Sequence, residues 1–154
     1  MESPTFTIAA FYRDPKAALD WLTRAFGFEV IMMIEGPEDS PHMCHYEMAI
    51  EGRGRIMIGG EWAEWTRSPA SIGGANTQSA HVALTSDLDT HCARARAAGA
   101  GIAAEPADQF YGDRTYRAVD PEGHVWTFAH HVRDVSRAEA EAAIGLKIEA
   151  PSWA

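Results

Sequence analysis

The chain has 154 residues, of which 46% are hydrophobic and 10% aromatic, so it can bury the core of one compact domain. Its 22 acidic and 13 basic residues give a formal net charge of −9, which argues against nucleic-acid and membrane-surface partners. Two cysteines outside any CxxC motif, no secretory signal pattern and no membrane-length apolar stretch predict a cytoplasmic protein.

The first half of the chain predicts a βαβββ unit. Residues 5–12 (TFTIAAFY) are β-branched and aromatic, which is typical of a strand. Asp14 and Pro15 then form an N-cap and a first helical position, and Gly27 provides a C′ glycine, so a helix is expected between them. Three further strands are expected at residues 30–35, 43–50 and 55–60.

The second half repeats the same order of elements. A strand is expected at residues 78–85, a helix at 87–98 and three more strands at 101–105, 114–120 and 125–131. The hairpin segments EGRGRIMI (51–58) and DPEGHVWT (120–127) align at a constant offset. A single βαβββ unit leaves one sheet face uncovered and needs its copy, so the repeat predicts an α+β fold of two tandem modules.

The modules account for most of a single domain that spans residues 1–154. The first module covers residues 5–60 and the second residues 78–131, with an inter-module loop at 61–77 that carries Trp62 and Trp65. Residues 132–154 form a C-terminal helix and tail, in which Ser136 and Glu139 have the spacing of a capping box.

Three segments carry a resemblance to a known family. AFGFEV (25–30), SAHVALTSD (79–87) and DPEGHVWTF (120–128) together resemble the vicinal-oxygen-chelate superfamily of glyoxalases, bleomycin-resistance proteins and dioxygenases. YGDRTYRAVDPEGHVWTF (111–128) is most similar to the PhnB-type, bleomycin-resistance-like branch. The resemblance covers residues 5–131 and implies modules whose sheets curve around a cavity, and it also implies a homodimer. The sequence leaves open whether two modules pair within the chain or across that dimer.

Family members that use a metal hold it with His or Glu from the first and last strand of each module. By resemblance these four positions fall on Thr7, Ile58, His81 and Thr127. Only His81 is an effective metal ligand, since a divalent ion needs several nitrogen or carboxylate donors at about 2 Å. We therefore expect neither a metal nor another cofactor.

Strand alternation and hairpin pairing predict which side chains line the cavity. Arg117 is expected opposite Thr127 with Thr115 behind it, whereas Trp126 and Phe128 are expected under the helices. The same reasoning in the first module places Tyr46 and Ile58 in the cavity. The expected ligand-binding residues are His81, Arg117, Thr127, Thr115, Thr7, Tyr46, Phe11, Trp62 and Trp65.

Two functions are consistent with this lining. The first is metal-independent binding of a small planar or cationic compound, in the sheet cavity or in a dimer groove. The alternative is a lyase or isomerase of glyoxalase type that acts on a small oxygenated substrate, with His81 as the base and Arg117 as its electrostatic partner. Whether the protein is an enzyme therefore stays open at this point.

Overall fold

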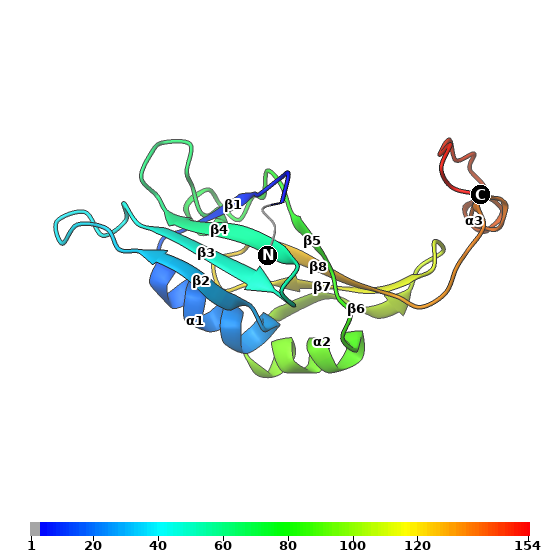
Figure 1. Cartoon of the computed structure of the whole chain (residues 1–154), viewed down its shortest axis with the longest axis horizontal. Helices are drawn as coiled ribbons and strands as arrows, with labels where there is room; N and C mark the ends of the chain where they lie inside the picture. The colour runs from blue at the N-terminus through cyan, green and yellow to red at the C-terminus, as the bar shows by residue number, and fades with distance from the viewer. Residues whose placement is uncertain (1–3) are drawn as a thin grey trace.

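A computed structural model describes residues 4–154, which form two βαβββ modules followed by a short C-terminal helix. Each module has a mixed four-stranded sheet, with strand orders β1-β4-β3-β2 and β5-β8-β7-β6 (Figure 1). In each sheet the first strand runs parallel to the last, and the remaining pairs are antiparallel. The predicted α+β class with tandem modules is confirmed.

The elements of both modules agree in order with those expected. The first module consists of β1 (Ala9–Tyr12), α1 (Pro15–Phe26), β2 (Glu29–Ile34), β3 (His45–Ile50) and β4 (Gly54–Gly60). The second consists of β5 (Ala80–Ala83), α2 (Leu88–Ala97), β6 (Gly101–Asp108), β7 (Asp113–Val119) and β8 (Val125–His131). A short 3-10 helix, η1 (Pro69–Ser71), lies between the modules, and α3 (Arg137–Ile144) follows them.

The helix boundaries follow from local sequence. The Asp14 side chain accepts a hydrogen bond from the Ala17 N–H at the start of α1, and Gly27 ends that helix with a φ of 77°. Glycine adopts this left-handed conformation without the steric cost that a Cβ atom would impose. The capping residue of α3 is Ser136, as the capping box predicts.

Both helices cover one face of their sheets and leave the opposite face open (Figure 1). The hydrophobic core that packs against the helices includes the even-numbered residues of β3 together with Ile56 and Ile58 of β4. Trp126 and Phe128 of β8 are buried in the same core, as expected. We call the sheet surface turned away from the helices the open face.

The two modules are joined through their helices. Arg94 of α2 donates to the carbonyls of Arg24 and Thr23 at the last turn of α1, over 2.7 and 2.8 Å. His91 of α2 bridges the Phe26 carbonyl and the Tyr116 hydroxyl. The second module therefore satisfies the carbonyls of Arg24 and Phe26, which the last turn of α1 leaves without a backbone partner, and adds a second donor to Thr23.

The hairpin turns of the two modules make reciprocal contacts. Glu51, in the β3–β4 turn, accepts hydrogen bonds from the backbone N–H groups of Thr85 and Ser86 just after β5. Glu122, in the β7–β8 turn, accepts them from the N–H groups of Arg13 and Asp14 just after β1. Each module thus caps a strand end of the other through equivalent hairpin turns.

The C-terminal segment lies away from the two modules (Figure 1). It packs mainly on itself, because the Trp153 indole donates to the Val135 carbonyl and the Arg137 N–H donates to the carbonyl of Ala154. Within residues 4–154, no helix combines the length and apolar character needed to traverse a lipid bilayer.

Candidate functional site

The open face of the second sheet carries most of the predicted polar residues. His81 lies beside Thr127 in the parallel β5–β8 pair, and Arg117 lies opposite Thr127 across the β7–β8 hairpin. The Arg117 Nε donates to the Thr127 hydroxyl over 3.3 Å, and the Thr115 hydroxyl accepts from Gln109 over 2.9 Å. The expected register of this hairpin is confirmed.

The expected placement of Tyr46 and Ile58 in the cavity is wrong, because the β4 residue that corresponds to Thr127 is Met57 and not Ile58. Ile58 pairs with Tyr46, and both point into the core rather than into the cavity. The Tyr46 hydroxyl donates to Glu35 at 2.8 Å on the helix side. The error comes from aligning Gly54 with Gly123, since the turn glycine with positive φ in the first module is Gly52.

The correct register brings an unpredicted ionic cluster to the open face of the first sheet. Glu47, only 7% exposed, lies in β3 opposite Met57. His45 lies 3.1 Å from one Glu47 carboxylate oxygen, and the Arg55 Nε lies 3.4 Å from the other. Sequence alternation along β3 contains this signal, because Glu47 and His45 share the face opposite Tyr46. Assigning the wrong face to β3 hid it.

Two adjoining cavities lie along the seam between the modules, where β1 comes close to β5. One has a volume of about 250 Å³ and is lined by Phe11, Trp65, Arg67, Asn76 and His124, among others. The second, of about 490 Å³, is lined by Arg53, Arg55, His81 and apolar residues from both modules. Ile8, Ile56 and Trp126 line both cavities, so the two form one continuous site, which we call the seam site.

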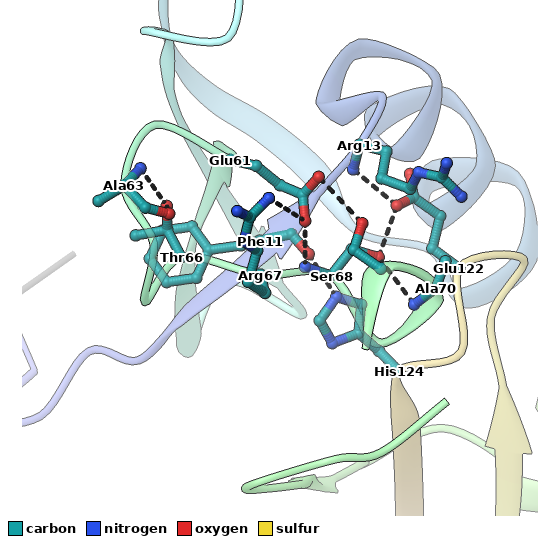
Figure 2. A network of polar contacts seen from close by, with 11 residues as sticks. Phe11, Arg13, Glu61, Ala63, Thr66, Arg67, Ser68, Ala70, Glu122 and His124 are labelled. Carbon is teal, nitrogen blue, oxygen red and sulfur yellow. Dashed lines mark hydrogen bonds and ion pairs between the residues drawn. The ribbon is translucent and has the colours of Figure 1, made fainter. Parts of the chain in front are cut away.

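The inter-module loop is fixed above this site by buried polar contacts (Figure 2). The Ser68 hydroxyl donates to Glu122 over 2.7 Å, and the Ser68 N–H donates to Glu61 over 2.9 Å. The Asn76 side chain accepts from the Val125 N–H and donates to the Gly123 carbonyl. These bonds hold the loop in one conformation, although it contains only one short helical turn.

The fixed loop presents two tryptophans to solvent. Trp65 is 71% exposed and Trp62 45% exposed, and their rings pack edge to face with centroids 5.0 Å apart. Trp65 also contacts Phe11 of β1 edge to face at 6.0 Å, at the mouth of the smaller cavity. Exposing this much aromatic surface on a rigid loop costs hydrophobic free energy, and it leaves ring faces accessible for stacking.

The seam site unites only part of the predicted ligand-binding set. Phe11, Trp65 and His81 line it, whereas Thr115, Arg117 and Thr127 lie on the open face of the second sheet. Trp62 lines neither cavity but contacts Trp65, which does. Thr7 precedes β1 and lines neither cavity, and Tyr46 is buried in the core. Arg53 and Arg55, which line the larger cavity, were not predicted.

The three histidines in and next to β8 make contacts that stabilise the fold. His124 lies 2.7 Å from the Phe11 carbonyl and His130 lies 3.3 Å from the Leu84 carbonyl, so both tie strands together. His131 lies between Asp113 and Asp134, and hydrogen bonds to these carboxylates raise the pKa of His131.

The residues at the family metal positions do not fit a divalent ion. The Ile58 side chain has no donor atom and lies in the core. The structural counterparts of His81 and Thr127 in the first module are Ala9 and Met57, which pair in the same parallel register. In the described part of the chain, no group of three or more His, Cys, Asp or Glu side chains is arranged to hold a metal.

Comparison with known proteins shows clear relatives. Residues 6–128 match the family model described as the glyoxalase/bleomycin resistance protein/dioxygenase superfamily. An uncharacterized protein of Mycobacterium bovis, Mb0911c, is 30% identical over 135 residues, which cover 85% of this chain and 86% of that protein.

Solved structures share the same fold. TioX from Micromonospora sp. ML1 is 31% identical with a TM-score of 0.61, and the match covers 84% of this chain and 100% of TioX. TnmS3, an antibiotic binding protein from Streptomyces sp. CB03234, is 20% identical with a TM-score of 0.66, and the match covers 84% of this chain and 97% of TnmS3.

Proposed function

Because the chain belongs to the glyoxalase/bleomycin resistance protein/dioxygenase superfamily, we propose that it binds a small planar compound at the seam site without a metal. The observation that carries the proposal is the pair of exposed tryptophans on a rigid loop beside a cavity. The antibiotic-binding role of TnmS3 supports a binding function for this fold.

The lining favours a planar ligand over a cationic one. Among the residues that the structure describes, no aspartate or glutamate lines either cavity of the seam site. A cation would find aromatic faces there but no carboxylate. The ligand contacts we propose are Phe11, Trp65 and His81, with Thr115, Arg117 and Thr127 on the adjoining open face.

An enzyme of glyoxalase type has less support. His81, the proposed base, has no hydrogen-bond partner among residues 4–154 that would orient its ring. A general base is ordinarily positioned by such a partner.

We further propose that two chains form a homodimer. The proposed location is the cytoplasm, and the proposed branch of the superfamily is the PhnB type. All six residues of β2 are exposed, including the apolar run Val30–Ile34, and an edge strand of this kind is a liability unless covered. A second chain that packs against the open faces would bury β2, and one module from each chain would then form a closed barrel. The division into modules at 5–60 and 78–131, with loop 61–77 and tail 132–154, belongs to this proposal.

Matched pairs of ligands test the binding function. In a thermal-shift and tryptophan-fluorescence titration, we expect 2-naphthol to stabilise the protein and to quench its fluorescence. Decahydro-2-naphthol, which has a similar size but no aromatic ring, should bind more weakly because it cannot stack on Trp65. Equal effects of the two compounds, or none from either, would contradict the proposal.

A further inference from the structure

We propose that the ligand of the seam site carries a planar carboxylate, which Arg55 binds in the larger cavity while the aromatic body extends toward Trp65. The inference rests on the proposed binding function and names the chemical class of its ligand. It is carried by the hydrogen-bonding state of Arg55 and by the composition of the cavity wall.

Arg55 has hydrogen-bond donors that the protein does not use. Its Nε atom is buried and, within residues 4–154, has no hydrogen-bond partner. The nearest charge is Glu47, whose oxygen lies 3.4 Å from the Nε without the geometry of a hydrogen bond. Glu47 is shared with His45, which lies 3.1 Å from its other oxygen. A guanidinium has five N–H donors in a planar fork, and the Nη donors of Arg55, on a side chain that is 24% exposed, make no hydrogen bond within residues 4–154 and can meet a ligand.

The wall of the larger cavity is rich in donors and poor in acceptors. Arg53, Arg55 and His81 are its charged or titratable members, and the others are small or apolar. Arg53 donates to the Ala83 carbonyl at 3.0 Å and pairs with Glu51 at 3.2 Å, so its guanidinium is held in place and Arg55 is the arginine with unused donors. An anionic acceptor is the group that such a wall recognises, and a carboxylate matches the planar fork of arginine with two parallel bonds.

The position of Arg55 also sets the shape of the ligand. The two cavities share Ile8, Ile56 and Trp126, so a rigid molecule can extend from one into the other. Its aromatic rings would contact this apolar strip and Trp65, and its carboxylate would lie at the Arg55 end. Amphipathic aromatic acids have this arrangement of an apolar body and one charged end.

A pair of nearly isosteric probes, one an anion and the other neutral, tests the assignment. We expect 2-naphthoate to bind about tenfold more tightly than 2-naphthamide at neutral pH, as measured by tryptophan fluorescence and calorimetry. Arg55→Gln should abolish this preference, and Arg55→Lys should retain part of it, because an ammonium supplies charge without the planar fork. Trp65→Ala should weaken both probes by the same factor, and Arg137→Gln, on α3, should change neither.

The outcomes distinguish the carboxylate assignment from the proposed binding of a planar ligand at the seam site. Equal affinities of the two probes for the wild-type protein, or an undiminished preference in Arg55→Gln, would overturn the carboxylate assignment while leaving planar-ligand binding intact. Binding of neither probe would overturn both. A thermal melt of each variant verifies folding. Should Arg55→Gln fail to fold, Arg55→Lys decides, and a full tenfold preference in that variant would overturn the role of the arginine fork.

Discussion

The Glu51 carboxylate of the first module accepts two hydrogen bonds from Thr85 of the second, one from the backbone N–H at 2.7 Å and one from the hydroxyl at 2.8 Å. Burial acts to raise its pKa, but the bonds from Thr85 and Ser86 prevail and lower the pKa of Glu51 to about 2. The charged carboxylate is therefore part of the contact that holds the modules together.

Replacing Glu51 by glutamine should weaken this contact. We expect Glu51→Gln to lower the free energy of unfolding by about 2 kcal/mol at pH 7, since it removes a charge-assisted set of hydrogen bonds. The depressed pKa means that the contribution of Glu51 is complete above its ordinary value of 4.5 and is lost as the pH falls toward 2. Urea unfolding measured across this range should show that the difference in unfolding free energy between the wild type and Glu51→Gln becomes smaller as the pH falls.

The control for this experiment is Glu38→Gln, in the exposed β2–β3 loop. It should leave the unfolding free energy nearly unchanged at every pH. A deficit of Glu51→Gln that stays constant from pH 7 to pH 2.5 would show that the carboxylate charge does not stabilise the module contact.

His91 makes a second link between the modules, and its protonation should matter. Burial lowers the pKa of His91, so the neutral ring is the folded form. Since the Phe26 carbonyl can only accept, the His91 Nε2–H donates to it at 2.8 Å, and Nδ1 accepts from the Tyr116 hydroxyl at 2.6 Å. We expect His91→Leu to cost about 3 kcal/mol, because both partners lose their bonds in the core.

The pH dependence and a double mutant check this reading of His91. A folded pKa below the ordinary 6.5 means that the stabilisation is complete above that pH and declines below it. The difference between wild type and His91→Leu should thus be smaller at pH 5.5 than at pH 7.5. Adding Tyr116→Phe should cost less in the His91→Leu background than alone, and strictly additive losses would argue against the bond.

Trp65 should matter for binding and little for stability. Its side chain is 71% exposed, so we expect Trp65→Ala to leave the melting temperature nearly unchanged. Loss of a stacking surface should weaken 2-naphthol binding about two- to tenfold, as measured by calorimetry. Trp153→Ala, in the C-terminal tail, is the matched control and should bind normally. If Trp65→Ala bound 2-naphthol with wild-type affinity, the inter-module loop would have no part in the binding site.

The proposed homodimer depends on the apolar edge strand β2. Ile34 is 54% exposed in the single chain, and we expect Ile34→Lys to shift the protein toward monomer in sedimentation velocity, because an interface would bury the new charge. Leu146→Lys, at an exposed leucine of the tail, should sediment like the wild type. A wild-type protein that is monomeric at all concentrations would refute the dimer.

Local chemistry made much of the fold predictable. The pairs Asp14–Pro15 and Ser136–Glu139 located helix starts, because capping involves residues only a few positions apart. The β7–β8 hairpin was assigned correctly because Gly123 lies in its turn, which fixed Arg117 opposite Thr127. The β3–β4 hairpin was assigned to the wrong face because Gly54, and not Gly52, was taken as its turn glycine. Placing a turn one residue too far along the chain reverses the face assigned to the side chains that follow it.

The sequence by itself determined the doubled βαβββ order and the helix caps, because each depends on residue type and near-neighbour spacing. Only the tertiary structure decided that His45, Glu47 and Arg55 cluster on one open face and that Arg55 and His81, from different modules, line one cavity. It also decided that Trp65 lies over Phe11, more than fifty residues away along the chain. The cluster depends on the register of the β3–β4 hairpin, and the other two contacts depend on how the loop and the two modules dock, which no local pattern encodes.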